Sequence, residues 1–234
     1  MRAHQHRGHI HHTATTYGQS VQGAALEVYL PSKQAELLIF AGIHGEEPET
    51  TVLLSKALRC LDVPLTHCAV VLAANPDGLV RGTRANANGV DLNRNFPAQN
   101  WQEADVCHRW EHGRPQEVAL SSGSQAASEP ETQALIKLIT NLQPNHIISM
   151  HGPLGCIDDP LASPLGQWMA QQTDLPLVPD VGDPTPGSFG SWCADEDLPV
   201  ITYELPAESV WSMQAKHLSV LNALLLGKYA SISP

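Results

Sequence analysis

Two histidines and several acidic residues, spread over the chain, carry the side chains that a hydrolytic zinc site requires. His44 is followed closely by Glu46 and Glu47, and His151 and Glu204 lie farther along. Two imidazoles and one carboxylate can hold a zinc ion and leave a coordination position open for water. A further glutamate, Glu204, could accept the proton of that water. The spacing predicts a zinc site and leaves Glu46 and Glu47 as alternatives for the carboxylate ligand.

A second group of polar residues could bind anionic parts of a substrate. Arg84 could stabilise the oxyanion that forms when water adds to an amide carbonyl. Asn93 and Arg94 offer an amide and a guanidinium, which suit a terminal carboxylate. The surrounding run Asp-Leu-Asn-Arg-Asn is uncommon in a loop with few other charges, whereas residues 86–89 are typical of ordinary turns.

Buried strands that end in turns are expected to position these side chains. The apolar runs predict strands at residues 37–41, 69–74, 145–150 and 200–204, and helices at residues 49–61, 128–142, 164–173 and 208–228. Residues 75–78 are predicted to form a turn, and residues 78–128 a long loop region with short elements. Alternating strands and helices predict an α/β layer sandwich with a largely parallel or mixed sheet. The reactive residues then fall at the carboxyl ends of strands, where such sheets bind ligands.

The bulk composition predicts one globular domain that does not bind nucleic acid. The 234 residues are 42% hydrophobic and 16% charged, and the formal net charge is -11. An acidic surface repels a phosphate backbone, although a local cluster of Arg81, Arg84 and Arg94 can still bind an anionic substrate. We expect residues 17–234 to form a single catalytic domain, and the histidine-rich residues 1–16 to form a flexible arm.

Three features predict a cytoplasmic protein without a membrane partner. Residues 1–12 contain no apolar stretch of the kind found in secretory signals. The longest apolar run, residues 37–43, is too short to span a bilayer. The five cysteines are odd in number and form no CxxC pair, which is typical of reduced thiols. A homodimer is compatible with these features.

The order of the motifs, HxxE, then arginine, then NR, then histidine, then glutamate, resembles the zinc carboxypeptidase superfamily of metallopeptidases. The resemblance implies a three-layer α/β/α domain with a central mixed sheet and one Zn²⁺ ion. The resemblance favours Glu47 over Glu46 as the carboxylate ligand of the zinc ion. The implied roles are zinc ligation by His44, Glu47 and His151, oxyanion stabilisation by Arg84, carboxylate binding by Asn93 and Arg94, and general base for Glu204.

Four stretches are similar to one branch of this superfamily, whose members hydrolyse murein peptides. They are RANANGVDLNRNFPA (84–98), SEPETQAL (128–135), PLGCIDDP (153–160) and PGSFGSWCAD (186–195). The implied reaction, in cell-wall recycling, cleaves the γ-D-glutamyl–meso-diaminopimelate bond of a small peptide, the murein tripeptide. The far end of diaminopimelate carries an ammonium group and needs a polar pocket. Candidates for that pocket are Asp158, Asp159, Ser188, Ser191 and Asp195.

The sequence departs from the superfamily at one place, and two other functions compete with the amidase. Many members carry a mobile tyrosine a few residues before the segment that matches 187–192, but residues 181–186 contain none. The first alternative is a related zinc deacylase of small N-acyl amino acids. The second is a non-catalytic protein that binds muropeptides, although the presence of Arg84 and Glu204 disfavours it.

Overall fold

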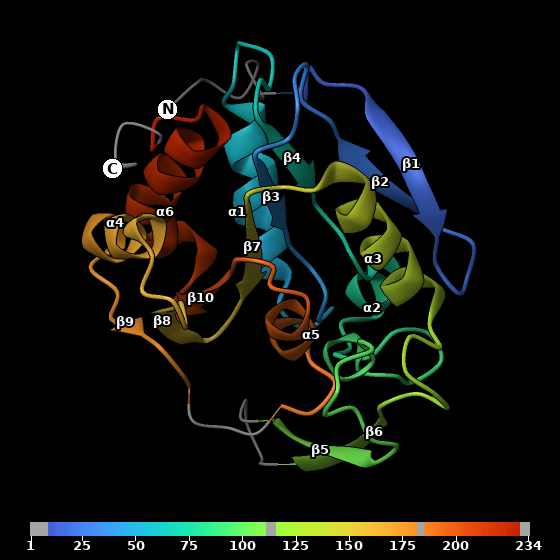
Figure 1. Cartoon of the computed structure of the whole chain (residues 1–234). Helices are drawn as coiled ribbons and strands as arrows, with labels where there is room; N and C mark the ends of the chain where they lie inside the picture. The colour runs from blue at the N-terminus through green and yellow to red at the C-terminus, as the bar shows by residue number, and fades with distance from the viewer. Residues whose placement is uncertain (1–8, 111–115, 182–184, 230–234) are drawn as a thin grey trace.

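The computed structural model describes residues 9–110, 116–181 and 185–229. These residues form a domain with a central eight-stranded sheet (Figure 1). The order of the strands across the sheet is β1-β2-β4-β3-β7-β10-β8-β9. The strands are β1 (Ala14–Gln19), β2 (Ala25–Tyr29), β3 (Leu37–Phe40), β4 (Cys68–Val71), β7 (His146–His151), β8 (Leu154–Asp158), β9 (Leu177–Val178) and β10 (Val200–Pro206). The central strands β4, β3, β7 and β10 run parallel, whereas β1, β2 and β8 each pair antiparallel with a neighbour. The sheet is therefore mixed, as predicted.

Helices cover both faces of the sheet, because successive strand residues point to opposite sides. The helices are α1 (Pro48–Arg59), α2 (Pro76–Arg81), α3 (Pro130–Leu142), α4 (Pro164–Thr173), α5 (Phe189–Asp195) and α6 (Val210–Leu225). In β3, Leu37 and Ile39 pack in one apolar cluster with α1, α4 and α6. Leu38 and Phe40 pack in a second cluster with α3 and α5. This arrangement confirms the predicted three-layer α/β/α fold.

The long region between β4 and α3 contains more regular structure than the sequence suggested. Residues 75–78, predicted as a turn, are the beginning of α2, where the Asn75 side chain accepts a hydrogen bond from the Gly78 backbone and caps the helix. A short 3₁₀ helix, η2 (Leu92–Arg94), follows, and β5 (Asp105–Trp110) pairs antiparallel with β6 (Gln116–Ser121) in a separate sheet. The predicted helix at residues 164–173 coincides with α4.

The amino-terminal boundary of the domain was predicted wrongly. Strand β1 begins at Ala14 and pairs with β2, so the predicted arm of residues 1–16 includes part of the sheet. Polar residues on an edge strand leave little hydrophobic pattern, which is why β1 was missed. Residues 1–8 lie outside the described part of the chain. Among the described residues, no helix has the length and apolar character needed to cross a bilayer.

The loop after β3 packs against α2 through two glycines. A β-carbon added to Gly45 would overlap the backbone of Gly78, so neither chain segment leaves room for a side chain there. Gly45 lies between His44 and Glu47 in sequence. The close backbone contact therefore fixes the course of the turn that carries both residues.

We predict that Gly45→Ala destabilises the fold and distorts this turn. Overpacking of this kind costs about 1–3 kcal/mol, and here the obstacle is backbone rather than a flexible side chain. Thermal denaturation should show a lower Tm, and purified protein should contain less zinc. The matched control is Gly190→Ala in α5, where the nearest atom to the added carbon is 3.9 Å away. Equal Tm values and equal zinc content for the two variants would contradict the prediction.

Candidate metal centre

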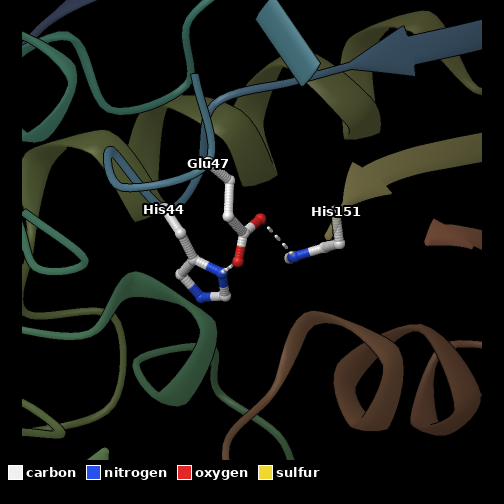
Figure 2. Close-up of side chains that lie close together, drawn as sticks. All are labelled: His44, Glu47 and His151. Carbon is white, nitrogen blue, oxygen red and sulfur yellow. Dashed lines mark hydrogen bonds and ion pairs between the residues drawn. The ribbon is translucent and has the colours of Figure 1, made fainter. Parts of the chain in front are cut away.

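Three buried side chains converge at the carboxyl ends of the central strands. The possible ligand atoms of His44, Glu47 and His151 all lie within 4.8 Å of one another (Figure 2). His44 lies in the turn after β3, Glu47 occupies the residue just before α1, and His151 is the last residue of β7. Parallel strands β3 and β7 are neighbours, so their carboxyl ends bring the three residues together. The structure thus assembles the ligand set that the sequence predicted.

Both imidazole rings direct a nitrogen toward the carboxylate of Glu47 (Figure 2). The distance from His44 Nδ1 to Glu47 Oε1 is 2.7 Å, and that from His151 Nδ1 to Glu47 Oε2 is 3.3 Å. The two ring centroids are 4.9 Å apart. Two imidazole nitrogens and one carboxylate facing a common point are a donor set that suits zinc with an open coordination position. The residues present therefore fit a zinc ion.

The charges around Glu47 keep its carboxylate ionised despite burial. Burial by itself would raise the pKa of Glu47, but His44 and His151 outweigh it and hold that pKa well below its usual range. Burial and Arg84 lower the pKa of His44, whereas Glu47 and Asp91 outweigh them and raise it. An ionised carboxylate is the form that ligates a metal.

Asp91 has a central position that the sequence did not reveal. Its side chain is fully buried, and its two oxygens serve different partners. Oδ1 lies 3.2 Å from His44 Nε2, while Oδ2 accepts a hydrogen bond from Arg84 Nε at 2.7 Å. A carboxylate on the outer nitrogen of a ligand histidine fixes the orientation and tautomer of the ring. In the sequence, the only sign of this role was the position of Asp91 two residues before Asn93, and that spacing did not indicate His44 as its partner.

Arg84 lies beside Glu47, one of the three predicted ligands. Its Nη1 atom is 3.5 Å from Glu46 Oε1 and 3.7 Å from Glu47 Oε1. Glu46 therefore pairs with the arginine and lies outside the converging group, which agrees with Glu47 as the ligand. Burial lowers the pKa of Arg84, but Asp91 and Glu47 outweigh it and raise that pKa, so the guanidinium stays charged. A fixed cation in this place suits an oxyanion.

Asn93 and Arg94 both belong to η2, directly after Asp91. The amide oxygen of Asn93 accepts a hydrogen bond from the backbone N–H of Phe189 at 2.8 Å. This contact joins η2 to the start of α5, on the same face of the sheet. Arg94 Nη1 donates to the backbone oxygen of Asn93 at 2.7 Å. The roles of both residues in carboxylate binding stay predictions.

Glu204 lies in β10, in register with His151 on the neighbouring strand β7. Its Oε2 accepts a 3.4 Å hydrogen bond from the backbone of Leu154. Burial raises the pKa of Glu204; His151 opposes this shift, and Glu47 adds to it. A raised pKa is a property of many general bases. The role of Glu204 as general base stays a prediction.

Four of the five candidates for the specificity pocket form hydrogen bonds within loops or at the start of a helix. Asp159 accepts hydrogen bonds from Leu161 and Ser163. The Ser188 hydroxyl accepts a hydrogen bond from the backbone N–H of Ser191 and so caps α5. Ser191 Oγ accepts a hydrogen bond from the Asn100 side chain, and Asp195 accepts one from the backbone N–H of Gln99. These contacts give the four residues a structural role, and their part in the specificity pocket stays a prediction. Asp158 differs, because its Oδ1 is buried without a hydrogen-bond partner among the described residues.

The position of the missing family tyrosine falls in residues 181–186, of which residues 182–184 lie outside the described part of the chain. Tyr203, the residue next to Glu204, does not replace it. Its ring packs in the cluster below α1, α4 and α6, and its hydroxyl lies 2.6 Å from His217 Nδ1. Adjacent residues in a strand point to opposite faces, so Tyr203 points away from the metal centre.

Comparisons with known proteins agree with this site. The chain is 50% identical over 213 residues to murein peptide amidase A of Escherichia coli K12, covering 89% of this chain and 88% of that protein. It is 46% identical over 217 residues to murein peptide amidase A of Vibrio campbellii, covering 91% and 87%. The crystal structure of a murein-tripeptide amidase from E. coli O157 superposes with a TM-score of 0.90 at 48% identity, covering 96% of each chain. A sequence profile of the zinc carboxypeptidases matches residues 4–157, and the chain therefore belongs to the zinc carboxypeptidase family.

Proposed function

We propose that this metallopeptidase hydrolyses the γ-D-glutamyl–meso-diaminopimelate bond of murein tripeptide and releases diaminopimelate. The substrate is inferred from two relatives named murein peptide amidase A, at 50% and 46% identity over most of the chain. The observation that supports hydrolysis is the register of Glu204 on β10 with His151 on β7, one of the three converging ligands.

His44, Glu47 and His151 would hold the zinc ion in this proposal. When bound there, zinc acidifies water and polarises the scissile carbonyl. Asp91 holds the ring of His44 from its far side and keeps the guanidinium of Arg84 beside Glu47. The protein thereby orients its donor groups before any substrate arrives, which is how electrostatic stabilisation becomes effective.

Glu204 would move the proton in the reaction. It accepts one proton from the attacking water as the new C–O bond forms, and then donates a proton to the leaving nitrogen as the C–N bond breaks. Arg84 would stabilise the negative charge on the carbonyl oxygen. Asn93 and Arg94 would bind the carboxylate adjacent to the cleaved amide. The products are a new γ-carboxylate on D-glutamate and the free amine of diaminopimelate.

We also propose that this reaction takes place in the cytoplasm and recycles cell-wall peptides. The four cysteines whose side chains the structure describes are free thiols, in keeping with a reducing compartment. A homodimer remains a prediction, and the mass of the purified protein in solution would test it.

We expect the purified enzyme to release diaminopimelate from L-Ala-γ-D-Glu-meso-diaminopimelate. A chelator such as 1,10-phenanthroline should abolish the release, and added zinc should restore it, because the ligands are retained when the metal leaves. The released amino acid can be quantified by chromatography. An N-acyl amino acid should be assayed in parallel. Cleavage of that compound alone, by a zinc-replete sample, would refute the proposed substrate.

We predict that Glu204→Gln lowers kcat by at least about 10³-fold, within the range that general acid–base groups contribute. The glutamine cannot carry the proton, but it keeps the shape of the side chain. Zinc content and substrate binding should therefore be unchanged, as measured by metal analysis and by calorimetry with uncleaved substrate. Glu208→Gln, at an exposed position four residues later, is the matched control and should keep full activity. Appreciable turnover by Glu204→Gln would exclude it as the base.

We predict that His151→Ala loses zinc, because two protein ligands hold the ion far less tightly than three. Metal analysis of the purified variant gives the readout without any assay of activity. His146→Ala, at the other end of the same strand, should retain zinc and serves as the control. Full zinc occupancy in His151→Ala would remove this residue from the ligand set.

A further inference from the structure

A second row of polar side chains crosses the sheet next to the row that contains His151 and Glu204. Ser149 of β7 pairs in register with Thr202 of β10, and Thr202 pairs with Asp158 of β8. We call these three residues the polar row. The adjacent row consists of His151, Glu204 and Cys156, paired across the same three strands.

The polar row faces the same side of the sheet as the metal centre. In β10, Ile201, Tyr203 and Leu205 pack in the cluster below α1, α4 and α6. The alternate residues, Thr202 and Glu204, therefore point to the opposite side. The same alternation holds in β7 and β8, where Met150 and Ile157 belong to that cluster. Ser149 and Asp158 thus lie on the side of His151 and Glu204.

Two atoms of the polar row are buried without a hydrogen-bond partner among the described residues. They are Oγ of Ser149, a residue only 1% exposed, and Oδ1 of Asp158. Buried polar atoms in folded proteins are nearly always hydrogen-bonded, and exceptions often mark a place for a ligand or for water. Two such atoms in one row, beside a reactive centre, indicate that a polar ligand group completes the row.

The acidic side chain of Asp158 favours a cation as the ligand group of the polar row. Burial, followed by the nearby carboxylates of Asp180 and Asp159, raises the pKa of Asp158 to about 6. A cation beside Asp158 would relieve both the burial and the repulsion. Asp159 already accepts hydrogen bonds from Leu161 and Ser163, so Asp158 supplies the acceptor. The hydroxyls of Thr202 and Ser149 add two further acceptors, and an ammonium group offers three donors.

The spacing of the two rows sets the length of the ligand. Residues two apart in a strand are about 6.7 Å apart, a distance that an extended side chain of lysine length spans. We propose that the polar row binds the distal ammonium group of the leaving diamino acid, while its reacting amide lies beside Glu204. This inference rests on the proposed function and specifies how the enzyme would select diaminopimelate.

Two substrates that differ only in this ammonium group test the proposal. One is L-Ala-γ-D-Glu-meso-diaminopimelate, and the other ends in 2-aminopimelate, which lacks the distal amine. Wild-type enzyme should prefer the first in kcat/KM by roughly 10- to 100-fold, the range for hydrogen bonds to charged groups. In Asp158→Asn the ratio of the two kcat/KM values should fall to near unity, mainly because kcat/KM for the diaminopimelate peptide decreases. Asp174→Asn, an exposed acid paired with Lys216, is the control and should keep the preference.

Ser149→Ala provides a second variant that separates binding from folding. The serine hydroxyl has no partner among the described residues, so its removal should not lower Tm, whereas KM for the diaminopimelate peptide should rise several-fold. If Asp158→Asn does not fold, the wild-type preference and Ser149→Ala decide the question. The proposed role of the polar row would be wrong if wild-type enzyme released diaminopimelate but showed no preference between the two substrates. It would also be wrong if both variants kept the wild-type preference. Either result would leave the proposed function standing. No release by wild-type enzyme would overturn both.

Discussion

The interaction on which the rest of the site depends is a buried chain of alternating basic and acidic groups. Arg84, Asp91, His44, Glu47 and His151 follow one another, and each contact between neighbours measures 3.3 Å or less. Buried carboxylates are costly unless they are paired and hydrogen-bonded. Here both carboxylates lie between two basic groups, so removal of one member would leave its neighbours buried without compensation. The chain of contacts therefore fixes the donor atoms of the metal centre as a unit.

The topology of the sheet brings this chain of residues together. His44 and His151 follow neighbouring parallel strands, and Glu204 lies in register with His151 on the next one. Parallel strands end at one edge, so side chains distant in sequence meet there without long connections. The turn after β3 then places Glu47 at the start of α1, and the close contact between Gly45 and Gly78 keeps that turn in place.

Both faces of the sheet bury an apolar cluster, but only one face also carries the metal centre, and neighbouring residues in β10 illustrate this difference. Tyr203 packs in the apolar cluster below α1, α4 and α6, while Glu204 faces the metal centre. The first face supplies stability through closely packed aliphatic side chains. The second face carries polar groups near the strand ends, among them Ser149 and Asp158 with their unpartnered atoms. The specificity site that we propose would need no additional element of structure, because strand pairing alone sets Ser149, Thr202 and Asp158 side by side.

The sequence by itself determined the local structure and the ligand types. Strong apolar periodicity located β3, β7, β10 and α4, because this signal depends on residues close in the chain. The order of the family motifs along the chain singled out His44, Glu47 and His151. Short or polar elements such as β1, β8 and α5 were missed for lack of such a pattern. Only the tertiary structure decided that Asp91 supports His44, that Asp159 and Ser188 hold loops, and that Ser149, Thr202 and Asp158 form one row. These roles depend on strand register and on contacts between distant segments, which the order of residues along the chain does not specify.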